Sequence, residues 1–261
     1  MAAVETVLGQ ARAEGRAALV TYVTAGIRED WLDLLRVMID AGADAVEIGL
    51  PFSDPMLDGP AVQRASSTAI SRGTTMACTL AQLRDMKGLD TPLIAMSYAN
   101  HAYTRGLRQY CHELADCGFS GTIVPDLPVS EAGEYLDEAG DAGLDAILMV
   151  TPSTPDQQMR VIAERSRGFL YVMSVMNTTG RTYERDDAAR WAVAARSRKH
   201  SARPVIIGFG IDTPERAAAA AAYADGVIVA SALMRQVMDG APGAEIGRYV
   251  RELRTAIDAA Q

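Results

Sequence analysis

Two carboxylates close together in the chain, Glu47 and Asp58, are the residues best placed to carry chemistry. Glu47 alternates with apolar residues within 46–50, so its side chain points to the opposite face of a strand from theirs. Burial would raise the pKa of such an acid and let it give and take protons near neutral pH. Asp58 follows in a loop rich in Pro and Gly. Each acid also has a structural alternative, a hydrogen bond within the fold for Glu47 and a helix cap or Asx turn for Asp58.

Eight short apolar segments rich in Val, Ile and Leu alternate with longer amphipathic stretches along the chain. This order predicts parallel strands joined by right-handed helical crossovers, and eight such units close into a (β/α)8 (TIM) barrel. We therefore expect one α/β domain over residues 1–261, with an extra helix at 75–87. An open doubly wound sheet is the alternative, but no G-x-G-x-x-G follows the first strand. The predicted strands are 17–23, 44–50, 92–98, 121–125, 144–150, 168–175, 204–209 and 225–229.

Cap residues mark several helix ends in the sequence. Residues 154–157 predict a capping box with Pro155 at the first helical position, and Thr213 precedes Pro214 in the same way. Glycines that can adopt a left-handed conformation are expected to close three helices, at Gly73, Gly118 and Gly143.

Charge and residue types exclude several classes of function. A net charge of −8 gives no basic face for a phosphate backbone, so we expect no nucleic-acid partner. The 3 Cys and 3 His residues lack zinc spacing and form no disulfide framework, so we expect no metal and a reducing compartment. No apolar run approaches the length needed to cross a bilayer. These features predict a soluble cytoplasmic protein with a small-molecule ligand and no membrane contact.

The active site of a (β/α)8 barrel lies at the carboxyl ends of its strands. Two turns there, Gly208-Phe209-Gly210 and Ala230-Ser231, follow the last two predicted strands. Barrels commonly bind phosphate at this place through backbone N–H groups and a helix N-terminus, which requires no Lys or Arg. The alternative is ordinary turn chemistry, which glycine alone does not exclude.

The segment 47–63, Glu-Ile-Gly-Leu-Pro-Phe-Ser-Asp-Pro-x-x-Asp-Gly-Pro-x-x-Gln, resembles the signature of the tryptophan synthase alpha chain family. The resemblance implies a (β/α)8 barrel that splits indole-3-glycerol phosphate into indole and glyceraldehyde 3-phosphate without a cofactor of its own. It also implies a PLP-dependent beta chain as partner in an α2β2 complex. Similar elements follow in family order across most of the chain, at 96–100, 124–128, 171–180, 208–210 and 230–231.

The resemblance also assigns roles by position. Glu47 matches the family's general acid–base residue, and Asp58 matches the carboxylate that contacts the indole N–H. Tyr171 matches a tyrosine beside these acids. The implied substrate-binding positions are Tyr98, Asn100, Tyr171, Thr179 and Phe209. The implied phosphate-binding positions are Gly180, Gly210, Ala230 and Ser231.

Three positions near the expected phosphate site depart from the family pattern. Ala230 stands where the family usually has Gly, which is harmless at negative φ and strained at positive φ. Asn177 also replaces a usual Gly, and Asn tolerates the left-handed region well. Val175 replaces an Arg that is frequent in some members. These changes concern substrate affinity and communication with a partner more than the chemistry at Glu47 and Asp58.

Three other functions stay open from the sequence. A paralogue would release free indole as a stand-alone lyase of another pathway. A non-catalytic regulatory subunit would bind the phosphate ligand only to activate a PLP-dependent partner, although retention of both acids argues against it. A phosphate-binding isomerase on the same barrel is supported by fold-level analogy alone.

Overall fold

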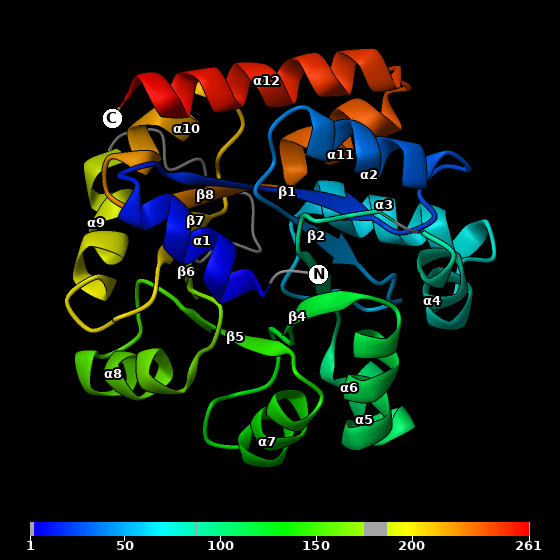
Figure 1. Cartoon of the computed structure of the whole chain (residues 1–261), viewed down its shortest axis with the longest axis horizontal. Helices are drawn as coiled ribbons and strands as arrows, with labels where there is room; N and C mark the ends of the chain where they lie inside the picture. The colour runs from blue at the N-terminus through cyan, green and yellow to red at the C-terminus, as the bar shows by residue number, and fades with distance from the viewer. Residues whose placement is uncertain (1–2, 87, 175–186, 261) are drawn as a thin grey trace.

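The computed structural model describes residues 3–86, 88–174 and 187–260, where strands and helices alternate (Figure 1). The strands are β1 (Ala18–Thr24), β2 (Ala45–Gly49), β3 (Leu93–Met96), β4 (Phe119–Ile123), β5 (Asp145–Val150), β6 (Leu170–Met173), β7 (Val205–Gly208) and β8 (Gly226–Val229). The helices are α1 (Val4–Ala13), α2 (Trp31–Asp40), α3 (Pro60–Ser71), α4 (Met76–Arg84), α5 (Ala99–Arg105), α6 (Leu107–Asp116), α7 (Gly133–Asp141), α8 (Asp156–Arg165), α9 (Asp187–Ser197), α10 (Pro214–Ala221), α11 (Ser231–Met238) and α12 (Gly243–Ala259). Every predicted strand is confirmed, and its ends lie within 2 residues of the predicted ones.

The eight strands close into one barrel in chain order. Each strand pairs in parallel with the next, and β8 pairs back with β1. Because all strands run in one direction, their carboxyl ends meet at the same rim, which we call the mouth. The predicted (β/α)8 barrel is confirmed, and so is the extra helix expected at 75–87, which is α4.

The core lies inside the barrel and between the barrel and its helices. Strands β1 and β2 are buried along their whole length, as expected where helices cover the outer face of a parallel sheet. Helix α2 packs its apolar stripe inward with the i, i+3, i+4, i+7 spacing of Trp31, Leu34, Leu35 and Met38. The last helix, α12, packs against α2 and α10 and covers the outside of the barrel near the junction of β1 and β8 (Figure 1).

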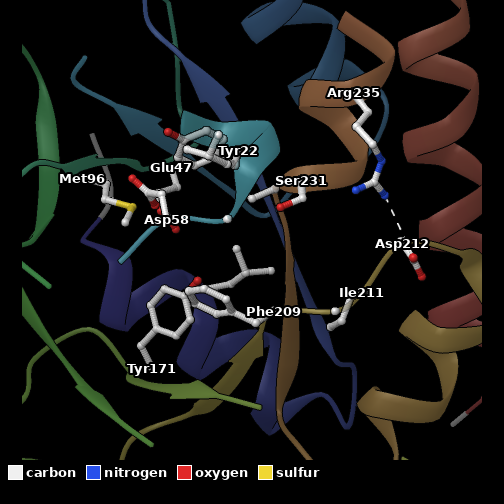
Figure 2. A pocket seen from close by; sticks show the side chains of 15 residues that line it. Tyr22, Glu47, Asp58, Met96, Tyr171, Phe209, Ile211, Asp212, Ser231 and Arg235 are labelled. Atoms are coloured by element: carbon white, nitrogen blue, oxygen red, sulfur yellow. Dashed lines mark ion pairs between the residues drawn. The ribbon is translucent and has the colours of Figure 1, made fainter. Parts of the chain in front are cut away.

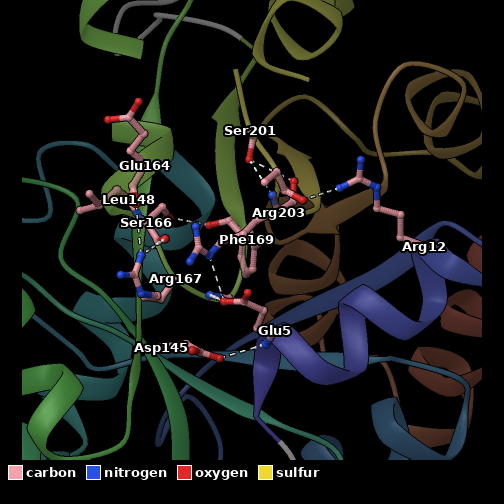
Figure 3. A network of polar contacts seen from close by, with 12 residues as sticks. Glu5, Arg12, Asp145, Leu148, Glu164, Ser166, Arg167, Phe169, Ser201 and Arg203 are labelled. Atoms are coloured by element: carbon pink, nitrogen blue, oxygen red, sulfur yellow. Dashed lines mark hydrogen bonds and ion pairs between the residues drawn. The ribbon is translucent and has the colours of Figure 1, made fainter. Parts of the chain in front are cut away.

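A polar network joins α1 to the amino end of the barrel, opposite the mouth (Figure 3). The backbone N–H of Glu5 donates to Asp145 Oδ2 at 2.9 Å, at the start of β5. Glu5 Oε2 accepts from Arg203 Nε at 2.9 Å and from the backbone N–H of Gly168 at 3.3 Å. Helix α1 is thereby fixed to the segments that enter β5, β6 and β7. These contacts hold α1 at the amino end of the barrel and have a structural role.

One predicted helix start is wrong. The proposed capping box at 154–157 placed Pro155 inside the helix, but α8 begins at Asp156 and Pro155 precedes it. The hydroxyl of Thr154 accepts the backbone N–H of Thr151 at 2.9 Å, so it serves the loop and not the helix. The hydroxyl of a residue between a turn and a helix can accept a hydrogen bond from either one, and here it accepts from the turn.

Other predicted helix ends are confirmed. The Thr213 hydroxyl accepts from the backbone N–H of Arg216 at 3.2 Å, and Pro214 begins α10. Three glycines after helices have the expected positive φ, namely Gly73 (83°), Gly118 (89°) and Gly143 (76°).

No helix in the described ranges is both long enough and apolar enough to span a membrane. In the same ranges, no group of 3 or more His, Cys, Asp or Glu side chains is placed to hold a metal ion. Cys78 is an exposed thiol, and Cys111 and Cys117 are buried thiols.

Candidate active site

A pocket of about 190 Å³ opens at the mouth of the barrel (Figure 2). Figure 2 shows the two acids at one end of it and Ser231, Asp212 and Arg235 toward the other. The predicted site residues that line it are Glu47, Asp58, Tyr171, Phe209, Gly210, Ala230 and Ser231. The remaining lining residues are Tyr22, Gly59, Val62, Met96, Ile211, Asp212, Ile228 and Arg235.

Glu47 lies in the middle of β2, and its side chain points into the pocket. Only 1% of the residue is exposed, and Oε2 has no hydrogen-bond partner among the described residues. Burial raises the pKa of Glu47 to about 8, with a further contribution from the negative charge of Asp58. At neutral pH the carboxyl is therefore mostly protonated, which is the state that a general acid needs.

Asp58 reaches the same pocket from the loop between β2 and α3. The Tyr98 hydroxyl donates to Asp58 Oδ2 at 3.1 Å and accepts from the backbone N–H of Leu57 at 3.1 Å. Burial raises the pKa of Asp58 to about 6, and the hydrogen bond from Tyr98 opposes that rise. Asp58 is therefore mostly ionised at neutral pH while Glu47 is mostly protonated. Two carboxyls in one pocket thus hold different charge states, the arrangement that acid–base enzymes use.

Two tyrosines, Tyr22 and Tyr171, form walls of the pocket beside the acids. Each hydroxyl lies over a strand glycine: a Cβ added at Gly49 would be 1.8 Å from the Tyr22 hydroxyl, and one at Gly208 would be 2.5 Å from that of Tyr171. Any side chain at either glycine would displace the tyrosine. The Tyr171 ring lies 6.3 Å from the Phe209 ring, so the wall offers aromatic surface on which a flat ring can pack.

The other end of the pocket includes a strained turn after β7. Phe209 has a φ of 73° and Gly210 a φ of 75°, and the left-handed region is unfavourable for Phe. Ser174 fixes this turn, because its N–H donates to the Gly208 carbonyl at 3.2 Å and its hydroxyl donates to the Phe209 carbonyl. Strained residues that their neighbours hold in place cluster at ligand-binding sites.

Ser231 begins α11 directly after Ala230 and faces the same end of the pocket. Ala230 has a φ of −115°, so its departure from the family glycine causes no left-handed strain. The free N–H groups of a first helical turn and the positive end of the helix dipole attract anions. We call Gly210, Ala230 and Ser231 the anion cup.

Of the predicted site residues that the structure describes, Tyr98 and Asn100 do not line the pocket. Tyr98 bonds to Asp58 and stacks on Phe52 with the ring centroids 5.1 Å apart. Asn100 is exposed in the first turn of α5, and its side-chain oxygen accepts from the Thr104 hydroxyl at 3.5 Å. Direct contact of Tyr98 and Asn100 with a substrate stays a prediction. The positions that lie outside the described residues are Thr179 and Gly180, together with Val175 and Asn177.

Several lining residues were not predicted from the sequence. Tyr22 could have been found, because it is the direct register partner of Glu47 in the neighbouring strand. Arg235 could also have been found, because it lies four residues after Ser231 and so on the same helix face. Nothing in the sequence singles out Asp212, whose position depends on the path of the loop between β7 and α10.

The closed parallel barrel and the paired carboxyls at its mouth define the class of the protein as a (β/α)8-barrel enzyme. The family model described as tryptophan synthase alpha chain matches residues 8–257. The chain belongs to the tryptophan synthase alpha chain family, as the resemblance in the sequence implied. Members of this family cleave indole-3-glycerol phosphate, and the chain is a lyase of this type in tryptophan biosynthesis.

Similarity to members of the family extends over nearly the whole chain. The tryptophan synthase alpha chain of Prochlorococcus marinus (strain MIT 9313) is 40% identical over 252 residues, which cover 94% of this chain and 91% of the relative. That of Phenylobacterium zucineum (strain HLK1) is 44% identical over 230 residues, which cover 87% and 83%. Tryptophan synthase subunit alpha from Legionella pneumophila str. Paris has a TM-score of 0.90 at 31% identity, covering 99% of both chains. A chain of Mycobacterium tuberculosis tryptophan synthase has a TM-score of 0.89 at 31% identity, also covering 99% of both.

Proposed function

We propose that Glu47 and Asp58 are the catalytic residues with which this chain cleaves indole-3-glycerol phosphate to indole and D-glyceraldehyde 3-phosphate. The observation that carries the proposal is that two buried carboxyls line one pocket, where burial raises the pKa of Glu47 further than that of Asp58. The anion cup at the other end of that pocket suits the phosphate of the substrate. The reaction is a retro-aldol cleavage, which proceeds by proton transfers.

Glu47 performs both proton transfers in this mechanism. The bond that breaks joins C3 of indole to the first carbon of the glycerol chain. C3 first takes a proton from the Glu47 carboxyl and becomes tetrahedral, which leaves positive charge on the ring nitrogen. The Glu47 carboxylate then takes the proton of the hydroxyl next to the breaking bond. The C3 bond breaks, its electron pair returns to the ring, and the products are indole, an aldehyde and protonated Glu47.

Asp58 stabilises the charge that develops between these two transfers. Protonation at C3 makes the ring nitrogen cationic, and an ionised carboxylate that accepts its N–H hydrogen bond lowers the energy of that intermediate. The pocket is partly closed to water, so the interaction is stronger than it would be in bulk solvent. Tyr98 keeps Asp58 in place through the 3.1 Å hydrogen bond to Oδ2.

Orientation of the substrate follows from the two ends of the pocket. The aromatic walls, Tyr171 and Phe209, pack against the indole ring, and the anion cup binds the phosphate. Holding both ends fixes C3 near Glu47. The entropy cost of orienting the substrate is then offset by binding energy before the reaction step.

The direct test is release of indole by the purified chain from indole-3-glycerol phosphate. We expect indole and glyceraldehyde 3-phosphate in equal amounts. A non-catalytic regulatory subunit would bind the substrate without releasing indole. An isomerase would turn over a sugar phosphate and give no aromatic product. Either outcome would remove the proposed function.

The proposed partner is a PLP-dependent tryptophan synthase beta chain in an α2β2 complex. Membership of the alpha chain family and the likeness to chains in M. tuberculosis tryptophan synthase support this partner. Mixing with a beta chain should give a complex with the mass of α2β2 and faster indole formation. Rapid indole release without any such complex would favour the alternative, a stand-alone lyase paralogue of another pathway.

The rate should depend on pH as a bell-shaped curve. Asp58 must be ionised and Glu47 protonated, and the pKa values are about 6 and about 8 in the ligand-free chain. We therefore expect kcat/KM to be highest near pH 7, to fall below pH 6 as Asp58 gains a proton and to fall above pH 8 as Glu47 loses one. Steady-state kinetics from pH 5 to 9 measure this. A rate that keeps rising through pH 9 would contradict the role of Glu47 as the acid.

Replacement of Tyr98 by Phe should shift only the acidic side of this curve. The variant lacks the hydrogen bond that lowers the pKa of Asp58, so the acidic side is expected to move to higher pH. We expect kcat/KM at pH 7 to fall about tenfold, the scale of a hydrogen bond to a charged group. The phosphate of the substrate also titrates near pH 6, but this substitution does not change its pKa. If the acidic limb of the pH profile does not move in the variant, that limb reports the titration of the substrate phosphate and not that of Asp58.

A further inference from the structure

Arg235 and Asp212 lie at the end of the pocket away from the two acids (Figure 2), and the mechanism above gives them no role. Arg235 is the single cation among the described residues that line the pocket. The acidic lining residues in the same set are Glu47, Asp58 and Asp212. Because Glu47 is mostly protonated at neutral pH, a phosphate dianion that enters this pocket is repelled by Asp58 and Asp212, and the positive charge of Arg235 opposes that repulsion.

Arg235 is placed to reach the anion cup. It lies one helical turn after Ser231 on α11, and residues four apart share one face of a helix. Side chains on a helix lean toward its N-terminus, so the Arg235 side chain extends toward the turn that carries Ser231. Both residues line the same end of the pocket, in agreement with this geometry. The guanidinium adds a full charge to the partial charge of the helix dipole at that point.

Asp212 pairs closely with Arg216 and only weakly with Arg235. Asp212 Oδ1 accepts from Arg216 Nη1 at 2.9 Å, whereas Asp212 Oδ2 lies 4.0 Å from Arg235 Nη2. The second distance is too long for a hydrogen bond. The Arg235 side chain is 46% exposed, and an exposed ion pair of this length contributes little. Arg235 can therefore exchange Asp212 for a more strongly charged anion at little cost.

We propose that Arg235 is a phosphate-binding residue whose guanidinium donates hydrogen bonds to the phosphate of the substrate. The proposal rests on the proposed function, which supplies a phosphate monoester to this pocket. A planar guanidinium presents two parallel N–H donors that match two phosphate oxygens, and the anion cup contributes backbone donors from the other side. Asp212 competes for the same guanidinium and repels the dianion, so it lowers phosphate affinity.

Replacement of Arg235 by Met tests the proposal, because Met keeps an unbranched apolar stem and removes the charge. We expect the Kd for glycerol 3-phosphate, measured by calorimetry, to rise about tenfold, the scale of one charge-assisted hydrogen bond. The KM for indole-3-glycerol phosphate should rise by a similar factor, while kcat changes by less than about twofold. Arg235→Lys should recover part of the affinity, since it restores the charge without the planar pair of donors.

The matched control is Arg216→Met, which removes the other arginine that pairs with Asp212 but does not line the pocket. It should leave the Kd for glycerol 3-phosphate within about twofold of wild type, as expected for an exposed ion pair. Asp212→Asn should lower that Kd, because the competing negative charge is removed. Indole carries no phosphate and should bind equally to wild type and Arg235→Met.

An unchanged Kd for glycerol 3-phosphate in Arg235→Met would overturn the proposal, and so would an equal weakening in Arg216→Met. Calorimetry with glycerol 3-phosphate needs no turnover, so this result is separate from the test of the proposed function. A wild-type chain that binds glycerol 3-phosphate through Arg235 but releases no indole would remove the proposed reaction and keep the phosphate site.

Discussion

Replacement of Glu47 by Gln is expected to lower kcat by at least about 10²-fold, the usual scale for loss of a general acid–base group. Gln has nearly the same shape, but it has no acidic proton to give to C3 and no carboxylate to take the proton of the hydroxyl. Glu47 is 1% exposed, so solvent does not replace it readily. Both proton transfers are lost together, and the loss should therefore appear in kcat and not in KM alone.

Indole release at pH 7 by wild type, Glu47→Gln and Glu131→Gln measures this effect. Glu131 is exposed, so Glu131→Gln makes the same chemical change outside the pocket and should retain the wild-type rate. Circular dichroism and the Kd for glycerol 3-phosphate report whether Glu47→Gln folds and binds. A folded, binding-competent variant with kcat near that of wild type would contradict the acid–base role of Glu47.

The barrel could be predicted because its signals are local and repeat along the chain. Apolar runs such as 46–50 alternate with helical stretches, and the spacing of buried residues in α2 is visible in the sequence. The failure at the start of α8 has a physical cause. The Thr154 hydroxyl can accept a hydrogen bond from the helix or from the preceding turn, and it accepts from the backbone N–H of Thr151 in the turn. Local residue types do not decide between two such bonds.

The location of the candidate site could be predicted from the sequence, but the contacts between its side chains could not. Parallel strands bring their carboxyl ends together, so the loop after β2 and the turns after β7 and β8 had to meet at one mouth. A raised pKa at Glu47 could be predicted from the burial of a strand acid, but the contacts that set the pKa of Asp58 join distant segments and could not be predicted. The bond from Tyr98 to Asp58 joins residues 40 apart, and the Tyr22 hydroxyl fits only because Gly49 has no side chain.

The burial of Glu47 should make the ligand-free chain less stable as pH rises, and Glu47→Gln should remove this effect. The pKa of Glu47 is about 8 in the folded chain, against an ordinary value of 4.5 when unfolded. Between these values the folded chain holds a proton that the unfolded chain releases. The contribution of this group to stability is therefore complete below pH 4.5 and declines as pH rises toward 8, by up to about 1.4 kcal/mol per pH unit.

Urea unfolding of wild type, Glu47→Gln and Glu131→Gln from pH 5 to pH 8 measures the decline. We expect the free energy of unfolding of Glu47→Gln, minus that of wild type, to increase by about 3 kcal/mol over this range. A buried Gln amide carries a penalty of its own, but that penalty does not vary with pH and cancels in the comparison. Asp58 is present in all three proteins, so its own titration contributes equally to each. The free energy of unfolding of Glu131→Gln should change with pH in the same way as that of wild type. If that of Glu47→Gln also changes in the same way, Glu47 does not hold a proton in the folded chain at neutral pH and cannot be the acid that protonates C3.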